Sequence, residues 1–265
     1  MNKKIAVIGA GNLGKAIAYG LLKSKIVKPK DLTLSRRHIS SLSDFKQKGV
    51  CITTDNIDAV SNSNIILLAV KPYKFDEVID EIKSHLTTEH ILVSMVTGID
   101  INRIKSKIDK PISIFRAMPN TAIAIQESMT CISSAIENDP NISLVTNIFD
   151  NLGKTAVIDD ELMDAATVLA ASGIAFALRY IRASMQAGIE IGFSSNLAQL
   201  IASQTVKGAS SLVLSSNLHP EGEIDKVTTP LGITITGLNH MEFNGFSSSI
   251  IKGVLGSYNK IKSLD

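Results

Sequence analysis

"IAVIGAGNLGKAIAYGLL", residues Ile5–Leu22, is a glycine-rich turn between an apolar run and a helical pattern. Such a segment predicts a strand that turns sharply into a helix. In the turn, Gly9 permits the bend, Gly11 lets the backbone approach a pyrophosphate, and Gly14 lets the helix pack closely on the strand. The free N–H groups and the positive dipole end of the helix then face the phosphates. We therefore expect a βα unit that binds a nucleotide.

From Lys4 to about Ile158 the chain alternates between short β-branched runs and segments with helical periodicity. The runs are "KIAVI", "DLTLS", "NIILLAV", "HILVSMV" and "ISIFRA", with "MTCIS" and "KTAVI" as two further strands. Near-continuous apolar strands separated by helices predict a parallel sheet with both faces covered. The pattern indicates an α/β fold that starts with a Rossmann-like parallel-sheet domain over residues 1–160.

After about Glu161 the strand patterns stop, and the following segments read as helices rich in Ala, Gly, Ser and Ile. They carry few charges on any face, and a helix that is apolar all round must be buried on all sides. Helices of this kind cannot bury one another within so short a region. We therefore expect residues 161–265 to form an all-α dimerisation domain, covered by a second subunit in a dimer or a higher oligomer.

Composition and charge argue against several classes of protein. The formal net charge is only +2 without a long basic block, so no nucleic-acid partner is expected. The most apolar stretch stops at Arg179, short of the about 20 residues that a membrane span needs. No cleavage site follows Lys3, so a cytoplasmic protein is expected. Cys51 and Cys131 suggest two buried, reduced thiols, and the five histidines show no ligand spacing that would predict a metal site.

The end of the second predicted strand bears on the choice of cofactor. An NAD site expects an acidic residue about 20 positions after the glycine turn, where it accepts from the ribose hydroxyls. This chain has Ser35-Arg36-Arg37 there instead. A hydroxyl and two guanidinium groups suit a 2′-phosphate, although two arginines could also be ordinary solvated loop cations. We therefore expect NADP(H), with NAD(H) as the alternative.

Three further strands end in loops that would lie at the same edge of the sheet. Ala69–Pro72 closes the strand "NIILLAV", with a proline that breaks the ladder, and "SMVTGI" and "FRAMPNTA" (Phe115–Ala122) follow the next two strands. Each loop alone could be a plain strand stop. Together they form a row along the carboxyl edge, which is where ligands bind in open α/β sheets.

With these motifs in hand, the chain resembles the pyrroline-5-carboxylate reductase family over nearly its whole length. The resemblance rests on "IGAGNLGKAI", "LAVKP", "FRAMPNTA" and "HPEGEIDKVTTPLGITITGL", in this order and spacing. It implies a Rossmann domain followed by a helical domain that interleaves with a partner subunit. It also implies hydride transfer from NAD(P)H to the C=N carbon of L-1-pyrroline-5-carboxylate, giving L-proline, the last step of proline biosynthesis.

The resemblance also assigns cofactor contacts to residues of this chain. They are Gly9, Gly11, Asn12, Leu13 and Gly14 for the pyrophosphate, Ser35, Arg36 and Arg37 for the adenosine ribose or its phosphate, Asn56 near the adenosine half, and Ala69, Val70, Lys71, Pro72, Val96, Thr97 and Gly98 beside the nicotinamide.

The stretch "VTTPLGITITGLN" (Val227–Asn239) places threonines, a proline and a glycine directly before a new helical pattern. By resemblance, this loop holds the carboxylate of the substrate, through Thr229, Gly232, Ile233 and Thr234. Thr234 would lie near the ring nitrogen and is the candidate catalytic residue. N–H groups at a helix start suit a carboxylate. The alternative is that a threonine here simply caps the helix.

The chain departs from the family pattern on the substrate side. Ile174 stands where relatives have a proline, Arg182 where they have an acidic residue, and Leu231 where they have a glycine. These departures leave two other hypotheses open. One is a paralogue that reduces another small imine or carbonyl acid, and the other is a non-catalytic sensor that binds NADP(H).

Overall fold

The computed structural model describes residues 3–216 and 218–263, which fall into two compact units. The first contains the chain up to Ser172 together with the segment from Tyr258, and the second is Gly173–Ser257. The domain boundary at residues 160/161 stays a prediction. The first compact unit includes the helical turns that follow it, because Met163 packs with Met118 and Cys131 of the sheet.

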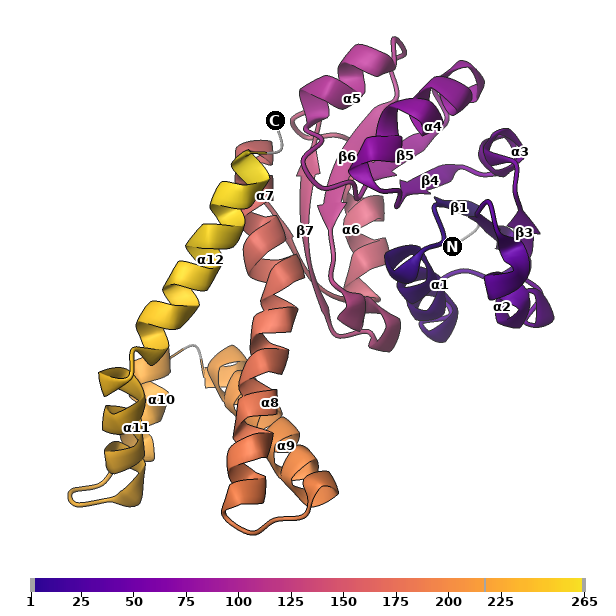
Figure 1. Ribbon diagram of the computed structural model, residues 1–265. Coiled ribbons are helices and arrows are strands. Elements are labelled where there is room, and N and C mark those ends of the chain that lie inside the picture. The colour runs from indigo at the N-terminus through magenta and orange to yellow at the C-terminus, as the bar shows by residue number, and fades with distance from the viewer. Residues whose placement is uncertain (1–2, 217, 264–265) are drawn as a thin grey trace. The chain divides into compact units, whose positions relative to one another are not determined.

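The first unit is built on one eight-stranded sheet in the order β3-β2-β1-β4-β5-β6-β7-β8 (Figure 1). The strands are β1 Ile5–Ile8, β2 Leu32–Ser35, β3 Cys51–Thr53, β4 Ile65–Leu68, β5 Ile91–Ser94, β6 Ser113–Met118, β7 Ser128–Ser134 and β8 Gly153–Val157. All neighbours pair in parallel except β6 and β7, which are antiparallel. The predicted Rossmann-like parallel sheet is confirmed. The short edge strand β3 has no counterpart among the predicted strands.

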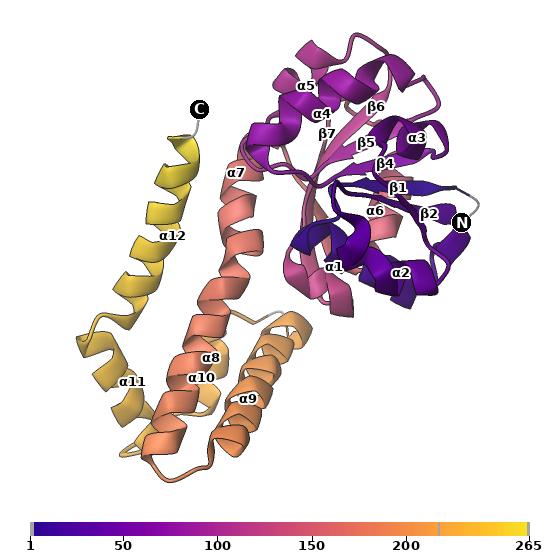
Figure 2. The ribbon, with the colours of Figure 1, turned by 45° about the vertical axis from the view of Figure 1, so that its right-hand side comes forward.

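Helices cover both faces of this sheet, as Figures 1 and 2 show. One face carries α1 Asn12–Lys23, α2 Ser43–Gln47 and α6 Ile142–Asp150, and the other carries α3 Asn56–Ser61, α4 Phe75–Ile82 and α5 Ile101–Lys107. Alternate residues of β1 explain the two layers: Ile5 and Val7 join the first core, whereas Ala6 and Ile8 join the second. Because both faces are buried, the strands read as continuous apolar runs.

Several short helical turns link the elements of the first unit. They are Pro29–Asp31, Ile39–Leu42, Pro72–Lys74, Lys83–His85, Thr121–Ile125 and Asp160–Leu162, followed by α7 Met163–Ala166 and a π-helical segment Thr167–Ser172. Cys131 is buried on β7, as expected. The expectation for Cys51 was wrong: it is exposed, because β3 is the edge strand of the sheet.

The second unit is helical. Its elements are α8 Gly173–Glu190, α9 Ser195–Ser216, α10 Pro220–Lys226, α11 Ile233–Phe243 and the greater part of α12 Phe246–Lys262. α8 packs on α9 where Gly188 faces Ala198, since a Cβ on Gly188 would lie 3.1 Å from that of Ala198. Large apolar side chains nevertheless remain exposed, among them Leu200 at 64% and Leu214 at 74%. This exposure agrees with helices that need a further protein surface to cover them.

One continuous helical path, Asp160–Glu190, is long and apolar enough to cross a membrane by length and composition alone. The apolar run that ends at Arg179 is shorter than this helix, which continues through Arg179 and Arg182.

Candidate nucleotide and substrate sites

A cavity of about 710 Å³ lies at the carboxyl edge of the sheet, beyond β1, β2, β4 and β5. It brings together most of the residues that the sequence assigned to the cofactor. These are Gly9, Gly11, Asn12, Leu13, Ser35, Arg36, Arg37, Asn56, Ala69, Val70, Lys71, Pro72 and Thr97. Parallel strands present all their carboxyl ends at one edge, so loops far apart in sequence meet here.

The glycine turn leaves room where a pyrophosphate would lie. Gly9 has φ +93°, and a Cβ there would lie 2.7 Å from the carbonyl oxygen of Ala69. A Cβ on Gly11 would meet only the carbonyl oxygen of Gly9, at 4.0 Å, so the Gly11 backbone is open to the cavity. Gly11 caps α1, whose first turn carries no acidic residue to compete for the helix dipole. The residues present therefore fit a dinucleotide.

Three predicted cofactor residues do not line this cavity. Gly14 is buried, and a Cβ there would lie 2.5 Å from the carbonyl oxygen of Gly9, so it acts in packing α1 on the turn. Val96 is buried at 1% exposure. Gly98 lines a second cavity, of about 590 Å³. Of the loop after β5, Met95 and Thr97 are the residues that reach the nucleotide cavity.

At the carboxyl end of β2, the cavity carries a polar network built on Ser35. The Ser35 hydroxyl donates to Asn56 Oδ1, and Asn56 Nδ2 donates to Glu81 Oε2 at 2.8 Å. Arg36 Nη1 donates to the carbonyl oxygen of Ala10 at 3.2 Å and to Ser41 Oγ at 2.7 Å. Both acceptors of Arg36 are uncharged oxygens. Its positive charge is thus held beside the glycine turn without being neutralised by them.

Arg37 shares a carboxylate with a second cation at the cavity rim. Its Nη2 pairs with Glu77 Oε1, while Lys74 Nζ lies 2.6 Å from Glu77 Oε2. The hydrogen bond from Lys74 and the nearby guanidinium of Arg37 keep the pKa of Glu77 below its ordinary value. These two effects outweigh desolvation, which alone would raise the pKa. Two cations around one carboxylate leave this rim net positive, which suits a phosphate.

Sequence reasoning missed some of the cavity's lining. Thr54, Lys74 and Thr121 line it, together with Ile8, His38, Tyr73, Val78 and Met95. Two of them adjoin motifs that were recognised: Lys74 follows Pro72 by two positions, and Thr121 lies within "FRAMPNTA". A search of each strand-end loop to its last polar residue would have found both.

The loop before α11 lies in the second unit. Gly232 is the N-cap of α11, and no side chain of the described residues caps it, so the alternative that a threonine caps this helix fails here. A Cβ on Gly232 would lie 2.6 Å from Thr229 Oγ1, which explains the glycine at this position. Thr229, Ile233 and Thr234 are exposed, and Leu231 adopts φ +60° with its side chain fully exposed. Uncapped N–H groups and nearby hydroxyls are chemically suited to a carboxylate.

Two family models match the chain. One, described as pyrroline-5-carboxylate reductase dimerisation, matches residues 160–264, and the other, described as NADP oxidoreductase coenzyme F420-dependent, matches residues 4–98. Each falls on one of the two regions that the sequence pattern distinguished.

Similar proteins cover nearly the whole chain. Pyrroline-5-carboxylate reductase 1 of Dictyostelium discoideum is 46% identical over 98% of this chain, which spans 49% of that protein, about half its length. Pyrroline-5-carboxylate reductase 2 of the same organism is 42% identical over 98% of this chain and 92% of its own length. The crystal structure of Plasmodium falciparum pyrroline carboxylate reductase with NADP bound is 27% identical, covers 99% of this chain and 98% of its own, and has a TM-score of 0.90. This chain belongs to the pyrroline-5-carboxylate reductase family.

Proposed function

We propose that this chain reduces L-1-pyrroline-5-carboxylate to L-proline with NAD(P)H, as the last step of proline biosynthesis. Relatives that match along almost the whole chain are named for this activity. The observation that carries the proposal is the cavity at the carboxyl edge of the sheet, where the backbone of Gly11 is open and Arg36 lies beside the glycine turn. This is the arrangement that a phosphate-bearing dinucleotide needs.

The chain's main task in this reaction is to align the reactants and exclude water, because an iminium carbon is already a strong electrophile. When bound, the reduced nicotinamide supplies the hydride. Gly9, Gly11 and the start of α1 would hold the pyrophosphate through backbone N–H groups. Ala69–Pro72 and Thr97, which line the same cavity, would lie toward the nicotinamide end.

Thr234 is the proposed catalytic residue. Its hydroxyl would donate a hydrogen bond to the ring nitrogen of the substrate, which orients the imine and helps to supply its proton. Thr229, Gly232 and Ile233 would hold the carboxylate. The exposed, uncapped start of α11 supports this assignment, since its N–H groups are available to an anion.

NADP(H) is the expected cofactor. Arg36 and Arg37 flank the end of β2, and Lys74 adds a third cation to the rim, against the carboxylate of Glu77. Guanidinium groups bind a 2′-phosphate through charge-assisted hydrogen bonds, which NAD(H) cannot use. NAD(H) would bind through the remaining contacts with lower affinity.

The chain self-associates through its helical region, in keeping with the dimerisation model that matches residues 160–264. A dimer or a higher oligomer would cover the apolar side chains of α9, among them Leu200 and Leu214. We further infer a cytoplasmic enzyme without a membrane or nucleic-acid partner. Light scattering of the purified protein tests the self-association, and cell fractionation tests the cytoplasmic location.

One assay tests the proposed reaction against its alternatives. Purified protein is supplied with NADPH and L-1-pyrroline-5-carboxylate, and with a panel of small keto acids, hydroxy acids and other cyclic imines. Oxidation of NADPH that depends on pyrroline-5-carboxylate and yields proline supports the proposal. Turnover only on another panel member would instead indicate a paralogue with a different substrate. Tight NADPH binding without any turnover would indicate a sensor.

A further inference from the structure

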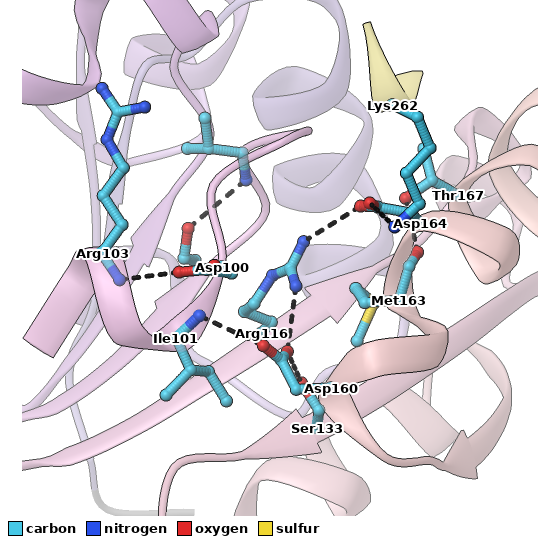
Figure 3. Close-up of polar contacts among 12 residues, drawn as sticks. Asp100, Ile101, Arg103, Arg116, Ser133, Asp160, Met163, Asp164, Thr167 and Lys262 are labelled. Atoms are coloured by element: carbon cyan, nitrogen blue, oxygen red, sulfur yellow. Dashed lines mark hydrogen bonds and ion pairs between the residues drawn. The ribbon is translucent and has the colours of Figure 1, made fainter. Parts of the chain in front are cut away.

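A cluster of polar side chains around the buried Arg116 lies beside the second cavity, outside the nucleotide site (Figure 3). Arg116, on β6, is only 2% exposed, and its Nη1 donates to Asp160 Oδ1 at 3.0 Å. Ser133, on β7, donates from its hydroxyl to the same oxygen at 2.7 Å. Asp160 thus joins two neighbouring strands at the middle of their antiparallel pairing, where Arg116 faces Ser133.

The other oxygen of Asp160 holds a loop rather than a strand. The backbone N–H of Ile101 donates to Asp160 Oδ2 at 3.1 Å (Figure 3). Ile101 is the first residue of α5, and the loop before it contains Thr97, which lines the nucleotide cavity. Gly98 of the same loop has φ +71° and lines the second cavity. One carboxylate therefore fixes the far end of a loop whose near end contributes to the nucleotide site.

The charge of Asp160 matters because Arg116 is buried. Arg116 Nε and Nη2 have no hydrogen-bond partner among the described residues. Asp164 Oδ1 lies 3.8 Å from Nη2, an ion-pair distance but longer than a hydrogen bond. Asp160 is thus the carboxylate that both hydrogen-bonds and neutralises this guanidinium. A buried cation that loses its partner reorganises its surroundings or admits water.

We propose that Asp160 is a positioning residue for the nicotinamide end of the cofactor site. Asp160 holds the Ile101 N–H and the Arg116 guanidinium together. It thereby fixes the position of loop 95–100 and of Thr97 within it. Arg116 also lies on the strand that leads to Thr121, a second residue of the nucleotide cavity. The turnover measurement for this inference rests on the proposed function, whereas the two binding measurements do not depend on it.

The test compares three variants. Asp160→Asn keeps the shape and removes the charge. Ser133→Ala removes one hydrogen bond to Asp160 and leaves the ion pair intact. Asp164→Asn is the matched control, because its carboxylate belongs to the same cluster yet pairs with Arg116 and Lys262 rather than with the loop. Thermal unfolding is recorded for all three, and kinetics are measured well below each midpoint.

For Asp160→Asn we expect kcat to fall about tenfold to a hundredfold, since small misplacements of reacting groups cost rates of this order. The fluorescence of bound NADPH should change, because its nicotinamide is held differently. Binding of 2′,5′-ADP, a probe that lacks the nicotinamide half, should stay within about twofold of wild type. Ser133→Ala should shift kcat and fluorescence in the same direction by less, and Asp164→Asn should leave both near wild type.

Several outcomes would overturn the inference. One is a folded Asp160→Asn protein with wild-type kcat and wild-type NADPH fluorescence. Another is an equal loss in Asp164→Asn, which would indicate only a general effect of the cluster on stability. If Asp160→Asn does not fold, Ser133→Ala decides, and unchanged kinetics and fluorescence there reject the proposal. If the wild-type chain does not reduce pyrroline-5-carboxylate, the proposed function fails while the fluorescence and 2′,5′-ADP measurements still decide the positioning role.

Discussion

Arg36 donates from Nη1 to the carbonyl oxygen of Ala10, at 3.2 Å, and Ala10 lies between the first two glycines of the glycine turn after β1. The end of β2 is therefore tied to the turn after β1 by a side chain that carries a full positive charge. A cation fixed in this place is ready to meet a phosphate on the adenosine ribose, at little further cost in side-chain entropy.

Removing the Arg36 guanidinium should weaken the binding of NADPH more than the binding of NADH. Hydrogen bonds to charged groups contribute about 1.5–3 kcal/mol, so Arg36→Ala should raise the dissociation constant for NADPH by about tenfold to a hundredfold. The dissociation constant for NADH should change by no more than about twofold to threefold, apart from any effect of losing the hydrogen bond to Ala10. Titration of both cofactors measures this. Lys83→Ala, which removes an exposed cation that does not line the cavity, is the control. Equal weakening of NADH and NADPH would show that Arg36 does not read the 2′-phosphate.

Thr234 and Thr236 offer a matched pair on α11. Thr236 Oγ1 donates to the carbonyl oxygen of Gly232 at 3.3 Å, whereas Thr234 is the residue assigned to the substrate. Thr234→Ala should lower kcat by about a hundredfold, the lower end of what proton transfer by a positioned group contributes. The dissociation constant for NADPH should not change. Thr236→Ala should leave kcat within about twofold of wild type, and wild-type turnover in Thr234→Ala would remove that residue from the site.

Leu231 adopts φ +60°, a left-handed conformation that costs a residue with a Cβ about 1–2 kcal/mol. Glycine removes this strain but loses more entropy on folding, so Leu231→Gly should raise the free energy of unfolding by up to about 1 kcal/mol. Leu231→Ala retains the Cβ and the strain, and because the leucine side chain is fully exposed it should leave stability nearly unchanged. Denaturant unfolding of both variants checks this. A loss of stability in both variants would mean that the leucine side chain is covered in the assembled protein, and a loss in Leu231→Gly alone would mean that the entropy cost of glycine exceeds the strain that it relieves.

The parallel sheet and the glycine turn could be predicted because their signals are local. Apolar β-branched runs such as that in β1 form buried strands, and the Gly9-to-Gly14 spacing adjoins one. β3 escaped prediction because it has three residues on an exposed edge, where no continuous apolar run is needed. Lys74 and Thr121 join the cavity only when separate loops fold to one edge.

The cluster around Asp160 had no local signal at all. Its hydrogen-bond partners Ser133, Arg116 and Ile101 lie 27, 44 and 59 positions away in sequence. Nothing in the vicinity of Asp160 in the sequence distinguishes it from Asp159 or Glu161. Such a contact depends on how strands and loops are placed by the whole sheet, and a single sequence does not reveal this.

The two cysteines should react very differently with a thiol reagent. Cys51 is exposed on the edge strand β3, whereas Cys131 lies within the sheet, where burial raises the pKa of its thiol. The thiolate is the reactive form, so native protein at mildly alkaline pH should show one fast thiol that Cys51→Ser abolishes, with Cys131 reacting after denaturation. Folding keeps this thiol neutral, whereas in the unfolded chain it ionises at its ordinary, lower pKa. The free energy of unfolding should therefore fall as the pH rises above that ordinary pKa. Cys131→Ala should flatten that alkaline decline, and two equally fast thiols in the native protein would contradict the burial of Cys131.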